Sequence, residues 1–135
     1  MPFIEWDEKY SVNVKEIDEQ HKGLFQMMND LNDAVAAGKA QEIIDATVHK
    51  MIEYAKVHFT TEEKYMTKFN YHDYPVHKAE HDKFSIKVME MNGRLKAGVY
   101  IMSTEIARLL KDWLTNHILV TDKKYSAYFN ENGLI

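Results

Sequence analysis

The chain has 135 residues, which is enough for one compact domain. Hydrophobic residues make up 45% and charged residues 28%, a composition typical of a globular protein rather than of a disordered chain. The formal net charge of −4 and the lack of any basic run argue against nucleic-acid binding. The chain has no cysteine, which excludes disulfides and thiolate metal sites, so any metal chemistry must use nitrogen and oxygen ligands.

The N-terminus reads MPFIEWDEKYSVNV and lacks the basic and apolar regions of a secretory signal. No stretch of the sequence is apolar over the length needed to span a bilayer. We therefore expect a cytoplasmic protein with no membrane partner.

Apolar residues recur at three-and-four spacing in four stretches, which predicts four amphipathic helices. The third begins at Pro75, a residue suited to a first helical turn, and Ser103 or Thr104 is a plausible N-cap for the fourth. The predicted helices cover about 18–37, 40–66, 75–97 and 103–121.

Helices of this length joined by short connections predict an all-α fold, an up-down-up-down antiparallel four-helix bundle. An N-terminal arm and a short C-terminal segment complete a single domain over residues 1–135. No sustained period-two alternation appears, so we expect no strands.

Five of the seven histidines fall within the apolar stripes: His21, His58, His77, His81 and His117. The other two do not, because His49 is rotated about 100° from its stripe and His72 lies in a predicted loop.

These five histidines sit near the start of the first and third helices and near the end of the second and fourth. An antiparallel bundle brings those four places to the same end, so we expect the imidazoles to converge at one level of the core. Glu62 and Asp122 lie at the same level.

A lone histidine on an apolar face is usually a satisfied core residue. Burying a polar group without a partner costs roughly 2–7 kcal/mol, however, so seven such groups must satisfy one another or bind something. A metal cluster is favoured over a purely hydrogen-bonded one, because metal cations satisfy imidazoles and carboxylates together.

The spacings support metal binding. His77 and His81, and likewise His58 and Glu62, are four residues apart and project from one helical face. Asp122 lies five residues after His117, so it needs a helix end or a widened turn to face inward.

Five nitrogens and two carboxylates are too many for one tetrahedral zinc and suit two octahedral-leaning ions. Three histidines on one ion, two on the other and both carboxylates bridging leave one coordination position open, if a solvent-derived bridge completes the set. A zinc or structural-metal bundle is the alternative.

The chain resembles the hemerythrin family, specifically the single-domain bacterial hemerythrins. The resemblance covers nearly the whole chain and is carried by a set of short motifs. These are Trp6, Ile17-Asp18-Glu19-Gln20-His21, His58-Phe59-x-x-Glu62-Glu63, His77-x-x-x-His81, Trp113-Leu114-x-x-His117-Ile118 and Asp122-Lys123-Lys124-Tyr125.

The resemblance implies a non-haem centre of two iron ions, bridged by an oxo or hydroxo group, that binds O2 reversibly for storage, transport or delivery. It assigns His77, His81 and His117 to the coordinatively saturated iron. It assigns His21 and His58 to the iron with the vacancy, and Glu62 and Asp122 to bridging positions.

An O2 carrier also needs a dry pocket, and five apolar residues next to the ligands are candidates for its lining: Leu24, Phe59, Trp113, Leu114 and Ile118. We expect a monomer that is not an enzyme and that delivers O2 to an oxygen-consuming enzyme. The alternatives are a di-iron peroxidase, nitric-oxide reductase or ferroxidase, or an O2 sensor acting through a partner.

Overall fold

The computed structural model describes residues 4–135, and within that range the regular structure is entirely helical. The four main helices are α1 (Lys15–Ala36), α2 (Ala40–Lys68), α3 (Tyr74–Lys96) and α4 (Ser103–Asp112). Shorter elements are the 3-10 helices η1 (Glu8–Tyr10) and η3 (Asp122–Tyr125), the π-helix η2 (Trp113–Thr121) and the C-terminal helix α5 (Ser126–Glu131). The predicted all-α class is confirmed.

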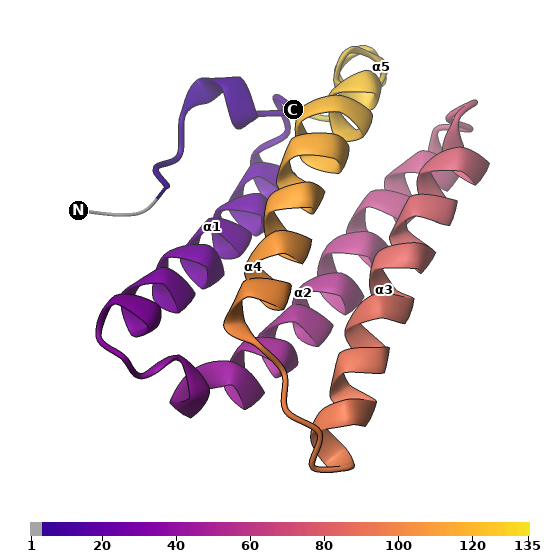
Figure 1. Cartoon of the computed structure of the whole chain (residues 1–135). Coiled ribbons are helices and arrows are strands. Elements are labelled where there is room, and N and C mark those ends of the chain that lie inside the picture. The colour runs from indigo at the N-terminus through magenta and orange to yellow at the C-terminus, as the bar shows by residue number, and fades with distance from the viewer. Residues whose placement is uncertain (1–3) are drawn as a thin grey trace.

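The helices alternate in direction along the chain, as Figure 1 shows. The α1–α2 and α3–α4 connections lie at one end of the bundle, and the α2–α3 connection lies at the other, beside α5. The starts of α1 and α3 therefore share an end of the molecule with the end of α2 and with η2. The predicted up-down-up-down arrangement is confirmed.

Helices α1 and α3 end in the same hydrogen-bonded motif. Gly38 and Gly98, which follow these helices, have φ values of +71° and +76°. After α1 the Lys39 amide donates to the Ala34 carbonyl at 2.7 Å, and after α3 the Val99 amide donates to the Arg94 carbonyl at 2.8 Å. These bonds satisfy carbonyl groups that the helix itself leaves free, and the left-handed backbone favours glycine.

One helix start and one helix cap differ in detail from the prediction. Pro75 does lie in the first turn of α3, but Ser103 is already the first residue of α4, and its N-cap is Met102, which makes no side-chain cap. Helix α1 begins at Lys15 rather than near 18, because the carboxylate of Asp18 holds the preceding arm in place. It accepts from the Val12 amide at 2.8 Å and from the Ser11 hydroxyl at 2.6 Å.

The core consists of two apolar clusters of buried residues. The larger is built along the four helices and includes Leu24, Val48 and Phe84. The smaller lies at the end beside α5 and includes Ile17, Met66 and Tyr125. The predicted histidine level falls between the two clusters, one helical turn after Ile17 and one turn before Leu24.

None of the described helices combines the length and the apolar character needed to cross a bilayer.

Gly23 and Gly98 are expected to respond in opposite directions to substitution by alanine. Gly23 lies inside α1, and a Cβ there meets nothing within 4 Å, so Gly23→Ala should stabilise the fold by roughly 0.5–1 kcal/mol. Gly98 needs a left-handed backbone, so Gly98→Ala should cost roughly 1–2 kcal/mol. Thermal unfolding of the two variants checks this, and shifts of the same sign would contradict it.

Candidate metal centre

The structure buries all seven predicted donor side chains at one level of the bundle, and none is more than 1% exposed. α1 supplies His21, α2 supplies His58 and Glu62, and α3 supplies His77 and His81. η2 supplies His117, and Asp122 is the first residue of η3. The other two histidines, His49 and His72, are exposed.

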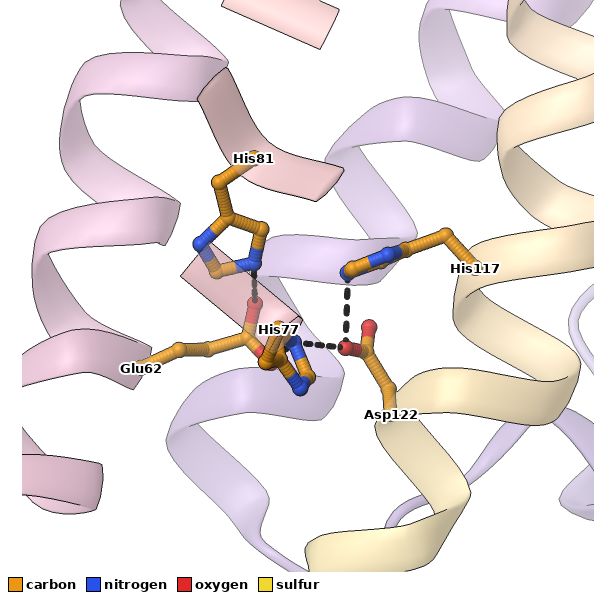
Figure 2. A group of neighbouring side chains, drawn as sticks. All are labelled: Glu62, His77, His81, His117 and Asp122. Atoms are coloured by element: carbon orange, nitrogen blue, oxygen red, sulfur yellow. Dashed lines mark ion pairs between the residues drawn. The ribbon is translucent and has the colours of Figure 1, made fainter. Parts of the chain in front are cut away.

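The seven side chains form two overlapping groups, within each of which the donor atoms lie within 4.8 Å of one another. The larger group contains His77, His81, His117, Glu62 and Asp122, whose side chains converge in Figure 2. The smaller contains His21, His58, Glu62 and Asp122. Both carboxylates therefore belong to both groups, and the larger group has one histidine more than the smaller.

In the larger group, Asp122 Oδ1 lies 2.8 Å from His77 Nε2 and 2.9 Å from His117 Nε2. Glu62 reaches the same group from the opposite side, with Oε1 3.4 Å from His81 Nε2 and Oε2 3.7 Å from His77 Nε2. Figure 2 marks three of these four contacts.

In the smaller group, each carboxylate turns toward one histidine. Glu62 Oε1 lies 2.7 Å from His58 Nε2, and Asp122 Oδ2 lies 3.0 Å from His21 Nε2. The two Nε2 atoms are themselves 3.0 Å apart.

A π-helix brings Asp122 into this arrangement. In a regular α-helix, a residue five positions further on points about 140° away from the first. Between Trp113 and Thr121 the backbone winds more widely, and the Asp122 amide donates to the carbonyl of His117, five residues earlier. The widened turn that the spacing requires is therefore present.

The donor atoms are left without hydrogen-bond partners inside the protein. This holds, over residues 4–135, for both oxygens of Glu62 and of Asp122 and for the Nε2 atoms of His77, His81 and His117. These oxygen and nitrogen atoms lie close together, but they are not aligned to form hydrogen bonds with one another. Each unsatisfied buried group costs about 1–3 kcal/mol. A cation bound among the lone pairs of these atoms would therefore stabilise the cluster.

The separations fit octahedral cations. With ligands about 2.1 Å from an ion, neighbouring ligand atoms lie about 3 Å apart. The shortest distances between Nε2 and carboxylate oxygens here are 2.7–3.0 Å. The nitrogen-and-oxygen donor set suits iron, and two groups sharing two carboxylates suit a pair of ions.

Electrostatics also favour ionised carboxylates. Burial and the charge of Asp122 both raise the pKa of Glu62, but His58 and His81 outweigh them and lower it. Burial lowers the pKa of His117, yet Asp122 and Glu80 outweigh burial and raise this pKa to about 10. The carboxylates are therefore ready to bind cations, whereas His117 must first release a proton.

Three side chains to which the sequence analysis assigned no role accept hydrogen bonds from the Nδ1 atoms of three histidines. His81 Nδ1 lies 2.8 Å from Glu63 Oε2, His117 Nδ1 lies 2.9 Å from Glu80 Oε1, and His58 Nδ1 lies 2.6 Å from Gln20 Oε1. Gln20, Glu63 and Glu80 each adjoin a predicted ligand in sequence: His21, Glu62 and His81. That adjacency is the signal that identifies them.

Aromatic rings stack on four of the histidines, and the ring on His77 is that of Tyr125, with centroids 5.5 Å apart. Phe59 stacks on His81 with centroids 3.9 Å apart, and Trp113 stacks on His117 at 3.8 Å. Tyr54, which the sequence analysis did not single out, stacks on His58 at 5.0 Å. The other three candidate pocket residues are all buried in the larger apolar cluster: Leu24, Leu114 and Ile118.

The fold and the paired donor groups define a four-helix-bundle protein with a two-metal centre. A model of the family described as Hemerythrin HHE cation binding domain matches residues 12–129. The sequence is 38% identical to the bacteriohemerythrin of Methylococcus capsulatus over 117 residues, 87% of this chain and 88% of that protein. It is also 38% identical to the myohemerythrin of Theromyzon tessulatum over 121 residues, 90% of this chain and 89% of that protein.

Among solved structures, wild-type hemerythrin superposes with a TM-score of 0.82 at 36% identity, covering 93% of this chain and 96% of that one. The chain belongs to the hemerythrin family, as its sequence motifs indicated.

Without metal, the stability of the protein should fall as the pH rises, whereas its apparent affinity for iron should rise over the same pH range. The raised pKa of His117 contributes stability to the metal-free chain that is fully present below about pH 6.5 and lost as the pH rises through about 10. Metal binding must displace that proton, so apparent iron affinity should increase over the same range. Thermal unfolding of chelator-treated protein at pH 7 and pH 9.5, with anaerobic ferrous titrations at both, measures the two trends.

His117→Gln serves as the control, because glutamine does not titrate. The metal-free variant should lose much of the decline in stability toward high pH. An identical decline in variant and parent would assign it to other groups.

Proposed function

We propose that this chain binds O2 reversibly at a non-haem di-iron centre, for oxygen storage, transport or delivery. One observation carries the proposal: two donor groups share two carboxylates, and one group has a histidine fewer than the other. With equal coordination numbers, the ion in the smaller group retains a free position. An external ligand can occupy that position.

The proposed ligands follow the two groups. His77, His81 and His117 hold one iron, and His21 and His58 hold the other. Glu62 and Asp122 bridge the pair, which matches their membership of both groups. When bound, the iron pair supplies the two electrons that O2 accepts on binding and returns on release.

The donor set favours reversible binding over cleavage of O2. Di-iron bundle proteins with a carboxylate-rich set place more negative charge on the metals, which favours high-valent iron. Here five neutral imidazoles accompany only two carboxylates, so the protein gives less support to high-valent states.

The apolar surroundings keep water from the centre. We propose that Leu24, Phe59, Trp113, Leu114 and Ile118 line the O2 pocket, and all five are buried. Trp113 Nε1 donates to the hydroxyl of Tyr54 at 3.3 Å, so the indole N–H in this part of the wall is paired within the protein. Exclusion of water protects bound O2 from release as a reduced product.

We further propose that residues 1–135 act as one hemerythrin domain, as a monomer in the cytoplasm, and that an oxygen-consuming enzyme is the recipient of the O2. In this role the protein is a carrier and not an enzyme. Its relatives are named hemerythrins, which supports this assignment.

Repeated oxygenation tests the proposed function. Anaerobically reduced, iron-loaded protein should develop a new visible absorption band on exposure to O2 and return to its starting spectrum when O2 is removed. The O2 bound should equal one molecule for each pair of irons. Continued O2 consumption with excess reductant would instead identify a catalyst, and a native preparation holding zinc would identify a structural site.

Glu62→Ala should reduce iron below a full pair per chain and lower the thermal stability of the loaded protein, because Glu62 contributes to both donor groups. His49→Ala is the matched control on the same helix, since His49 is exposed and distant from the cluster. Iron analysis and thermal unfolding measure both effects. Full iron loading of Glu62→Ala, or iron loss in His49→Ala, would show that the ligand set is wrong.

A further inference from the structure

We propose that Glu63 and Glu80 are positioning residues that make the two irons electrically unequal, lowering the reduction potential of the three-histidine iron relative to the two-histidine iron. The inference rests on the proposed di-iron function, but it concerns residues outside the ligand set. It follows from what each histidine ring contacts on the side facing away from the metals.

The three-histidine group has two anionic acceptors behind it. Glu63 faces Nδ1 of His81, and Glu80 faces Nδ1 of His117. Both carboxylates are only partly exposed, at 22% and 34% for the side chains, so solvent screens them less than fully exposed charges. The third ring, that of His77, has no partner at Nδ1 among residues 4–135.

Among residues 4–135, no carboxylate accepts from an Nδ1 atom of the two-histidine group. Nδ1 of His58 faces the amide of Gln20, and Nδ1 of His21 has no partner in the described chain. Among the described residues, two negatively charged acceptors therefore contact the three-histidine group from behind, and none contacts the two-histidine group.

The orientation of the Gln20 amide is fixed by its neighbours. The Thr61 hydroxyl donates to the Val57 carbonyl at 2.9 Å, so toward Gln20 it can only accept. The Gln20 amide nitrogen donates to that hydroxyl at 3.0 Å, which leaves the amide oxygen facing His58. His58 thus carries its proton on Nδ1 and keeps the Nε2 lone pair for a metal, with a neutral acceptor behind it.

The orientation of the Glu80 carboxylate is also fixed by its neighbours. Its carboxylate also accepts from the Thr121 hydroxyl, at 3.0 Å to Oε1 and 3.2 Å to Oε2. This fixes the carboxylate against the π-helical segment that carries His117. Carboxylate acceptors give His81 and His117 the same Nδ1-protonated form as His58, so all three rings present Nε2 to the metals.

The consequence for redox chemistry has a definite sign. A carboxylate that accepts from a ligand imidazole makes the imidazole a stronger donor and adds negative charge near the metal. Ferric iron carries one more positive charge than ferrous iron and gains more from both effects. Iron in the group backed by Glu63 and Glu80 is therefore easier to oxidise.

Three isosteric substitutions test the inference in the full, iron-loaded chain. Glu63→Gln and Glu80→Gln keep an oxygen acceptor but remove the charge, and each should raise the mean midpoint potential of the centre. Gln20→Glu adds a charge behind His58 and should lower it. If the charges act on different irons, all three variants should also bring the two one-electron midpoints closer together, the glutamate variants by raising the lower midpoint and Gln20→Glu by lowering the higher one. We expect a roughly tenfold change in the ferrous-to-ferric ratio at a given potential, which is about 59 mV for one electron.

Glu90→Gln is the matched control, because it removes the same charge from an exposed position on α3. It should leave the midpoint unchanged. Potentials are measured by anaerobic titration against redox mediators, with iron analysis and thermal unfolding of every variant.

Wild-type midpoints in the fully loaded Glu63 and Glu80 variants would overturn the inference, while the O2 function stands. A shift of the same sign in all three variants would also overturn it, because it would report structural disturbance rather than charge. If the glutamate variants lose iron, Gln20→Glu decides alone, and an unshifted or raised midpoint there overturns the inference. A wild-type chain without an iron pair would defeat the proposed function first.

Discussion

The architecture depends on one constraint: a layer of seven buried donors has to be satisfied away from water. Apolar clusters lie on both sides of the layer, so neither end of the bundle gives the donors access to solvent. The four carboxylate oxygens and five of the ring nitrogens have no hydrogen-bond partner in residues 4–135, although the nitrogen and oxygen atoms lie close together. Bound cations resolve this conflict, and metal binding then becomes part of the stability of the fold.

The same constraint explains the local backbone around the centre. Within α2 and α3, donors four residues apart share a face, and a regular helix is sufficient. His117 and Asp122 are five residues apart, and there the chain adopts a π-helix. Its wider winding turns both side chains inward, which a regular α-helix would not do. π-helical turns are rare and are found frequently at functional sites. The deviation coincides with Asp122, the one carboxylate of the donor layer that a regular helix would direct away from the other donors.

The sequence predicted the bundle because a three-and-four apolar spacing specifies amphipathic helices, and it predicted the donor level because antiparallel connections align helix ends. Prediction from the sequence failed where a single hydrogen bond decides where a helix begins or which residue caps it. The start of α1 depends on the Asp18 carboxylate holding the arm, and the start of α4 lacks the side-chain cap that Ser103 was expected to give. The acceptors Glu63 and Glu80 stand next to predicted donors in the sequence, but the ring that each one contacts lies on a different helix, so the contact becomes visible only in three dimensions.

The acceptors also show how a bundle uses neighbouring sequence positions for two different tasks. Gln20, Glu63 and Glu80 each stand next to a donor on their own helix, and each contacts a histidine on the helix that follows. Because adjacent helical residues point about 100° apart, one side chain faces the interior while the next faces the neighbouring helix. Each consecutive pair of helices is therefore joined twice, once through the layer of buried donors and once through a hydrogen bond behind it. These hydrogen bonds hold the rings of His58, His81 and His117, so the orientation of the three rings does not depend on a bound metal.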